Sequence, residues 1–245
     1  MEQFILVRHF MKLNNTFNYN KLAKYYDKIY FNKDYEKEVR FIQEILEKFN
    51  ARTILDVGCG TGEHIFRLEK LGFRCDGLDL NKGMLSIAKQ KVKNAQLLLG
   101  DMRNFNLEKK YDAIICMFAT FNYNLTIKDA IRTLLSFKKH LNERGIVLLD
   151  LHNVFCDGKK EIKNKEIEIR MRWSYNNKKR IEKTKAVFRI KDKIIEDTHT
   201  FRIFSIPEIK NLFKYAKFQE VVFYENYTFK KPTLRSKNIE VVGLK

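Results

Sequence analysis

Three glycines at alternate positions form the most distinctive chemical pattern in the chain. Gly58, Gly60 and Gly62 follow an apolar run at 53–57, which favours a buried strand, and lead into an amphipathic stretch at 62–71, which favours a helix. A glycine-rich turn between a strand and a helix lets a ligand approach main-chain N–H groups without a Cβ in the way. The pattern therefore predicts a nucleotide-type binding site at this turn.

The residue that follows the third glycine, Glu63, helps to distinguish a dinucleotide site from a site for a cationic or zwitterionic nucleoside ligand. A dinucleotide fold needs a glycine at this position, and a carboxylate at a helix N-terminus competes with a pyrophosphate for the same positive dipole end. A cationic or zwitterionic ligand suits the turn better. A phosphate-binding P-loop is excluded because the chain has no G-x-x-x-x-G-K-[ST] sequence.

Carboxylates stand at the ends of the next two predicted strands. Asp79 ends the run 73–79, and Asp101 follows the run 95–100. The two hydroxyls of a ribose are about a carboxylate's width apart, so a single carboxylate can accept both. A fourth strand is predicted at 111–117.

These four segments, taken in order, resemble the motifs of the class I S-adenosylmethionine (SAM)-dependent methyltransferases. Asp56-x-Gly58-x-Gly60-x-Gly62 matches the first motif, and the likeness covers 19–151 well and the rest more loosely. The resemblance implies that SAM is the methyl donor, with Asp79 on its ribose and Asp101 on its adenine amino group. The residues that it implies for SAM binding are Tyr19, Asp56, Gly58, Gly60, Asp79, Leu80, Met84, Asp101, Met102 and Met117.

Structural roles remain open for several of these residues. The three aspartates could instead cap turns or helices, and Met84 and Met102 could fill the core.

Three side chains are candidates for the methyl-transfer site. Tyr26 lies in an aromatic segment that resembles the lid of small-molecule methyltransferases, Tyr123 lies in the loop after the fourth strand, and His152 follows the fifth. That loop, 116–123, resembles the one in N-methyltransferases of nucleotide-linked amino sugars, which often have a histidine where Tyr123 stands. His199 fits a structural role. Amine acceptors can lose their proton after attack, so only a modest base is needed.

Alternating strand and helix patterns predict the architecture that positions these residues. The expected fold is α/β, a Rossmann-like, seven-stranded, mostly parallel sheet with helices on both faces, plus a small antiparallel β insertion. Period-two alternation from Ile167 onward predicts three strands in that insertion. The predicted parts are a helical lid segment at 1–50, the SAM-binding core at 51–153, the insertion at 154–204, and a helix and strands that complete the core sheet at 205–245.

Composition narrows the class of protein. With 44% hydrophobic and 32% charged residues, the chain has the composition of a soluble globular protein, and no apolar run reaches the length of a membrane helix. The start lacks the pattern of a signal peptide. Cys59, Cys75, Cys116 and Cys156 form no C-x-x-C pair, so we expect no metal site and a cytoplasmic protein.

The sequence favours transfer of a methyl group to an N or O atom of a small-molecule acceptor. The net charge of +18 suits an anionic acceptor, although evenly spread lysines also follow from compositional bias. An RNA-directed (tRNA or rRNA) methyltransferase is the second hypothesis, and a non-catalytic SAM-binding protein is the third. The insertion could form a homodimer surface.

Overall fold

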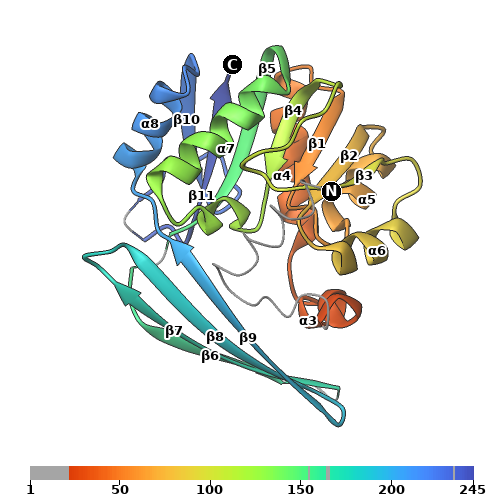
Figure 1. Cartoon of the computed structure of the whole chain (residues 1–245), viewed down its shortest axis with the longest axis vertical. Helices are drawn as coiled ribbons and strands as arrows, with labels where there is room; N and C mark the ends of the chain where they lie inside the picture. The colour runs from red at the N-terminus through yellow and green to blue at the C-terminus, as the bar shows by residue number, and fades with distance from the viewer. Residues whose placement is uncertain (1–21, 154, 164–165, 234) are drawn as a thin grey trace, which may run out of the picture.

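Two sheets organise the computed structural model, which describes residues 22–153, 155–163, 166–233 and 235–245 (Figure 1). The larger sheet has seven strands in the order β10-β11-β5-β4-β1-β2-β3, with β1 to β5 parallel and β11 antiparallel to both of its neighbours, β5 and β10. This confirms the predicted α/β, mostly parallel fold. Its strands are β1 Thr53–Val57, β2 Arg74–Asp79, β3 Leu97–Leu99, β4 Tyr111–Cys116, β5 Leu141–His152, β10 Glu220–Glu225 and β11 Asn238–Leu244.

Helices cover both faces of this sheet. Residues of α7 and α8 pack with Leu55 and Val147 on one face, and residues of α4 and α5 pack with Ile54 and Ile115 on the other. Neighbouring strand residues point to opposite faces, so each strand supplies both layers. The helices are η1 Ala23–Tyr25, α3 Tyr26–Ile29, α4 Tyr35–Lys48, α5 Glu63–Lys70, α6 Lys82–Lys91, η2 Thr120–Tyr123, α7 Ile127–Lys139 and α8 Ile206–Tyr215.

Local sequence signals set several helix starts. The side chain of Asn81 accepts the N–H of Met84 at 3.0 Å and begins α6. Ser205 and Glu208 form a capping box at the start of α8, with Pro207 in its first turn. These caps satisfy N–H groups that have no partner inside a helix. No helix in the described part of the chain is long and apolar enough to cross a membrane.

The second sheet is an antiparallel meander that lies beyond the carboxyl ends of the parallel strands, at the same end of the molecule as α3 (Figure 1). Its strands are β6 Gly158–Lys163, β7 Ile167–Asn176, β8 Ile181–Ile190 and β9 Lys193–Arg202. The prediction of three strands was wrong, because the structure has four. The additional strand, β6, is mostly charged and carries no apolar alternation, so its pattern did not indicate a strand.

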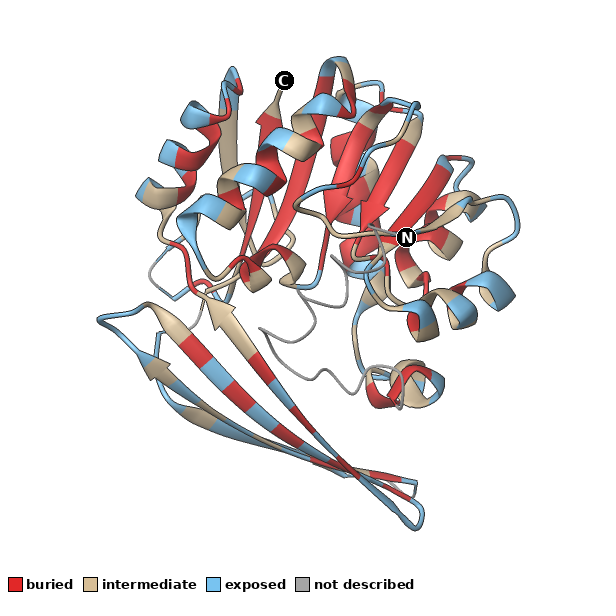
Figure 2. Cartoon of the chain, in the orientation of Figure 1, coloured by how far each residue is buried: buried red, intermediate tan, exposed pale blue. Residues whose placement is uncertain are grey.

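One face of this meander is buried, as the alternating colours along β8 show (Figure 2). Ile169, Phe188 and Ile190 on that face pack with Leu22, which precedes η1, and with Ile29, the last residue of α3. The insertion therefore has its own apolar core, formed together with the segment predicted to be the lid.

A single buried side chain joins the two ends of the insertion. Asn122, which is fully buried, accepts the His152 N–H at 3.0 Å and donates to the carbonyls of Arg202 at 2.8 Å and His152 at 3.3 Å. His152 ends β5 and Arg202 ends β9, so the chain leaves the core and returns to it at the same place.

Residues 142–145, whose Asn-Glu-Arg-Gly sequence is typical of a turn, form part of a longer strand. β5 begins at Leu141, and its register against β4 shifts between Tyr111 and Ala113. Arg144 there has a φ of 62°. The turn-type residues thus form an irregularity in the hydrogen-bonded pairing of β5 with β4. The sequence pattern alone does not distinguish such an irregularity from a loop.

Candidate functional site

The glycine turn is held against the end of β2 by main-chain hydrogen bonds. The N–H groups of Gly58 and Cys59 both donate to the carbonyl of Leu78, at 2.7 and 3.1 Å. Gly58, Gly60 and Gly62 have φ values of +76°, +54° and +78°, in the left-handed region that favours glycine. The turn therefore depends on glycine at all three positions.

Two of these glycines differ in what surrounds them. A Cβ on Gly58 would lie 2.4 Å from Cγ2 of Thr120, so η2 packs directly on the turn. A Cβ on Gly60 would have no heavy atom within 4 Å. There is thus open space over Gly60, as a site for a ligand requires.

Asp79 receives two main-chain N–H groups. Its carboxylate accepts from Gly60 at 2.8 Å and from Asn81 at 2.7 Å. Burial raises the pKa of the Asp79 carboxyl, and these two N–H groups oppose the rise. The helix cap is Asn81 rather than Asp79. Each carboxylate oxygen keeps a second lone pair, so Asp79 can still accept a hydroxyl.

Asp56 lies under the turn and is almost fully buried, at 1% exposure. Its Oδ2 has no hydrogen-bond partner among the described residues. Burial raises the pKa of Asp56 to about 6; His64 opposes the rise, Asp79 adds to it, and Lys33 opposes it more weakly. An unpartnered buried carboxylate is costly unless a donor or a cation reaches it.

A pocket opens above this turn. Met117 and the lid residue Tyr26, both predicted site residues, lie on its wall. The full lining is Tyr26, Tyr35, Gly58, Cys59, Gly60, Thr61, Glu63, His64, Met117 and Phe118. The pocket thus combines free space with the glycine main chain, and Asp56 lies buried beneath the turn rather than on the pocket wall.

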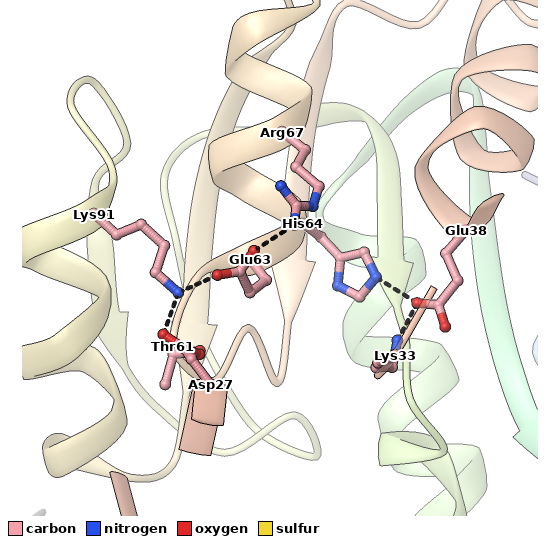
Figure 3. A network of polar contacts seen from close by, with 8 residues as sticks. All are labelled: Asp27, Lys33, Glu38, Thr61, Glu63, His64, Arg67 and Lys91. Carbon is pink, nitrogen blue, oxygen red and sulfur yellow. Dashed lines mark hydrogen bonds and ion pairs between the residues drawn. The ribbon is translucent and has the colours of Figure 1, made fainter. Parts of the chain in front are cut away.

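A polar network ties the lid to the helices beside the turn (Figure 3). Asp27 of α3 accepts from Thr61 at 2.6 Å and from Lys91 at 2.7 Å. Lys91 also lies 2.5 Å from Glu63, and Arg67 lies 3.2 Å from the other oxygen of Glu63. Glu63 is thus paired with two cations, a contact that its position after the third glycine did not indicate.

A second network flanks the same pocket. His64 Nε2 lies 2.9 Å from Glu38, which also pairs with Lys33 (Figure 3). Lys33 also lies 4.2 Å from the ring centroid of Tyr35 and 4.6 Å from that of Phe118. These contacts anchor the segment between α3 and α4 against the pocket wall.

The remaining predicted SAM-binding residues differ in their surroundings. Asp101 is held by Arg103, whose Nε and Nη2 lie 2.8 and 2.6 Å from its two oxygens. Met102 is partly buried against the core, and Met84 is buried at 3% exposure, so both also serve packing. Leu80 is exposed at 45%. Tyr19 lies outside the described residues.

The three catalytic candidates lie in different surroundings. The rings of Tyr26 and Tyr30 are tilted by 52° with centroids 4.7 Å apart, and Tyr30 meets Phe118 edge-on at 5.0 Å. His152 Nε2 lies 3.0 Å from Glu182 of β8. The Tyr123 hydroxyl lies 2.9 Å from His199 of β9.

Sequence reasoning missed the partners of these candidates. The partners are Glu182, Asp197 and His199, which alternate with exposed residues on β8 and β9. This alternation indicates that one side of each strand is buried, but it does not indicate which residues pack against that side. His199, which we expected to be structural, contacts a candidate catalytic residue. Among the described residues, no three His, Cys, Asp or Glu side chains are grouped as metal ligands.

Comparison with known proteins gives a family for the central region. Residues 54–145 match the family described as a methyltransferase domain. The dTDP-3-amino-3,4,6-trideoxy-alpha-D-glucopyranose N,N-dimethyltransferase of Streptomyces venezuelae is 34% identical over 143 residues, which are 56% of this chain and 60% of that protein. The match thus spans less than two thirds of that relative.

Solved structures share the fold over nearly the whole chain. An S-adenosylmethionine-dependent methyltransferase from Clostridium acetobutylicum ATCC 824 has a TM-score of 0.81 at 24% identity, covering 92% of this chain and 98% of that one. Streptomyces venezuelae DesVI has a TM-score of 0.76 at 24% identity, covering 90% and 97%. The resemblance read from the four sequence motifs is confirmed at the level of the fold.

Proposed function

We propose that this protein, whose residues 54–145 are a class I methyltransferase domain, transfers a methyl group from SAM to an amine nitrogen of a small molecule. The observation that carries the proposal is the glycine turn: Gly60 donates to Asp79, and the space above Gly60 is open. When bound, SAM supplies a methyl group on a sulfonium, which is a good leaving group for in-line displacement.

The chain's own residues divide the task of holding SAM. Asp79 would accept the ribose hydroxyls, and Asp56, whose Oδ2 has no partner among the described residues, would stabilise positive charge. Gly60 lets the main chain approach the ligand. Tyr26 and Met117 line the pocket and exclude water from it. Holding donor and acceptor in line can lower a barrier by about 7–11 kcal/mol in favourable cases, so positioning is the main contribution of the protein.

The proposed acceptor is an amine carried on a nucleotide-linked sugar. The named relative from Streptomyces venezuelae acts on such a compound, which supports the class. A dTDP group is anionic and suits the net charge of +18. We also propose that 51–153 binds the donor while 154–204 contributes to the acceptor side. A cytoplasmic location and a homodimer through the insertion are further proposals, of which the first accords with three buried free cysteines.

The donor site is tested by Gly60→Ala against Gly72→Ala. Both glycines have positive φ and open space, and Gly72 lies at the far end of α5. An alanine in this conformation costs roughly 1–2 kcal/mol of stability at either position. Only Gly60→Ala should weaken SAM binding in calorimetry, by at least about tenfold. Equal SAM affinity in the two variants would remove the site assignment, and Asp79→Ala gives a second test of the same site.

The activity is tested by methyl transfer from labelled SAM. The first acceptor is dTDP-3-amino-3,4,6-trideoxy-α-D-glucopyranose, followed by a panel of primary amines and by tRNA and rRNA fragments. Product with a small amine supports the proposal. Product with RNA alone favours the RNA-directed hypothesis, and SAM binding without any product favours the non-catalytic one.

A further inference from the structure

A chain of three side chains connects the second sheet to the core beside the glycine turn. The Tyr123 hydroxyl lies 2.9 Å from Nδ1 of His199, and Nε2 of His199 lies 3.5 Å from Oδ2 of Asp197. Tyr123 ends η2 in the core, whereas His199 and Asp197 belong to β9. Because the contact bridges residues 76 apart in sequence, it exists only when the two parts are docked.

The geometry of these rings is fixed by packing. His199 and Asp197 are 9% and 3% exposed and lie on the same face of β9 as Phe201, because alternate strand residues share a face. The ring of Phe201 stacks on His199 at 5.8 Å with an interplanar angle of 11°, and lies 4.7 Å from Tyr123. The imidazole thus has little freedom to turn away from the phenol.

The order of the three groups indicates where the proton lies. A carboxylate beside Nε2 favours the tautomer with hydrogen on Nε2, which leaves a lone pair on Nδ1 to accept the Tyr123 O–H. A hydroxyl that donates to such a nitrogen can transfer its proton to that nitrogen while its oxygen receives another proton. The Ser-His-Asp arrangement of hydrolases uses the same order of groups.

Burial favours the neutral form of His199. Burial lowers the pKa of the His199 imidazole, while the carboxylates of Asp197 and Glu182 oppose this effect. Within the described part of the chain, His152, which pairs with Glu182, and Tyr30, whose pKa Asp197 helps to raise, also face the cluster. A neutral imidazole with nearby carboxylates is ready to accept a proton and stabilise it.

The cluster is adjacent to the donor site. Thr120, at the other end of η2 from Tyr123, is the residue that a Cβ on Gly58 would strike at 2.4 Å. The four-residue element that carries Tyr123 therefore rests on the glycine turn.

We propose that Tyr123 accepts the proton released by the methylated amine and that His199, held by Asp197, is the positioning residue that receives the phenol proton in turn. This inference rests on the proposed function. The amine nitrogen forms a bond to the methyl carbon as the carbon–sulfur bond breaks, and that electron pair stays on sulfur. One N–H proton of the resulting ammonium passes to Tyr123 Oη, and the phenol proton passes to His199 Nδ1. The imidazolium then releases it to solvent when product leaves.

The resting arrangement can be tested without any substrate. Nitrogen NMR of the full chain, with its five histidines labelled, identifies His199 as the signal lost in His199→Asn. At pH 7 we expect a neutral ring with hydrogen on Nε2, and a shift of its Nδ1 signal in Tyr123→Phe. A ring with hydrogen on Nδ1 would overturn the proposal, because it could not accept from Tyr123. This readout is independent of whether the proposed function holds.

The kinetic test uses the dTDP-linked amino sugar named above, or the first amine of the panel that turns over. His199→Asn keeps a polar group near Nδ1 but cannot take a proton, so we expect kcat to fall about 100-fold and the acid limb of its pH profile to disappear. KM for SAM should stay within about twofold, and calorimetry with SAM verifies that the variant folds. Tyr123→Phe should lower kcat similarly, and the double variant no further, because the two act as a unit.

The competing assignment is His152, with Glu182 as its partner carboxylate. If His152→Asn removes the acid limb while His199→Asn retains it, His152 is the proton acceptor and the proposal fails. Additive losses in the Tyr123→Phe, His199→Asn double variant would also contradict it. Loss of the limb in His199→Asn alone supports it.

Discussion

At the scale of single residues, the donor site combines a strained backbone with buried charge. Asp56 has an oxygen without a partner among the described residues, and burial is the largest cause of its raised pKa. A buried, unpartnered carboxylate of this kind lowers the stability of the ligand-free protein. A cationic ligand can restore that stability when it binds. We therefore regard Asp56 as a residue whose ionisation is linked to occupancy of the pocket.

The affinity for SAM should consequently depend on pH. Because the pKa of Asp56 is about 6, its carboxyl is charged above that pH and largely neutral at pH 5. A cationic ligand prefers the charged form, so calorimetry should show SAM affinity about tenfold weaker at pH 5 than at pH 7.5. Asp56→Asn should bind more weakly at pH 7.5 and lose most of this dependence. A variant that kept the wild-type pH dependence would assign it to another group.

At the scale of elements, the connection between core and insertion depends on Asn122. Its amide serves three main-chain groups at the ends of β5 and β9. Asn122→Ala leaves those groups buried without partners, and each such loss costs roughly 1–3 kcal/mol. Chemical denaturation should show a free energy of unfolding lower by about 2–5 kcal/mol, since the losses are not fully additive.

Asn94→Ala is the matched control for that measurement. Asn94 is exposed, and only its main-chain N–H, which the substitution leaves in place, makes a hydrogen bond that the structure records, to Glu69. Its replacement should change the free energy of unfolding by no more than about 0.5 kcal/mol. Equal effects of the two substitutions would mean that Asn122 does not hold the insertion.

Elements also show what sequence could and could not predict. The glycine turn and Asp79 were found because glycine spacing and strand ends are local signals. The Tyr123–His199 contact was not, since it depends on how two sheets dock. The ion pair of Glu63 was not predicted for a related reason: its partner Lys91 lies 28 residues away, at the end of another helix. The strand β6 was missed because its charged residues carry no period-two signal.

At the scale of the whole molecule, buried acids make stability depend on pH. Glu240 of β11 is paired in register with Asp150 of β5, is fully buried, and has no partner among the described residues for either carboxylate oxygen. Burial raises the pKa of Glu240 to about 8, and the nearby Asp150 adds to the rise. The folded protein therefore holds this proton over a range in which the unfolded chain has released it.

The sign of the effect follows from that difference. A carboxyl whose pKa is raised on folding contributes stability that is complete below the unfolded pKa of about 4.5 and is lost as pH rises through about 8. Each pH unit in this window removes up to about 1.4 kcal/mol. Between pH 5 and pH 8, the free energy of unfolding measured in urea should therefore fall less for Glu240→Gln than for the wild type. The difference between the two decreases should be a few kcal/mol. Parallel stability curves for the two proteins would refute this.

The junction at Asn122 has a consequence for how such a protein can change. The chain departs from the core at His152 and returns at Arg202, and both ends meet at one buried amide. A segment whose two ends meet in this way is an insertion that can be exchanged, lengthened or shortened. Such a change leaves the order of the strands in the parallel sheet unaltered. Under the proposed division of roles, replacement of the insertion would change the acceptor side while the donor side is kept.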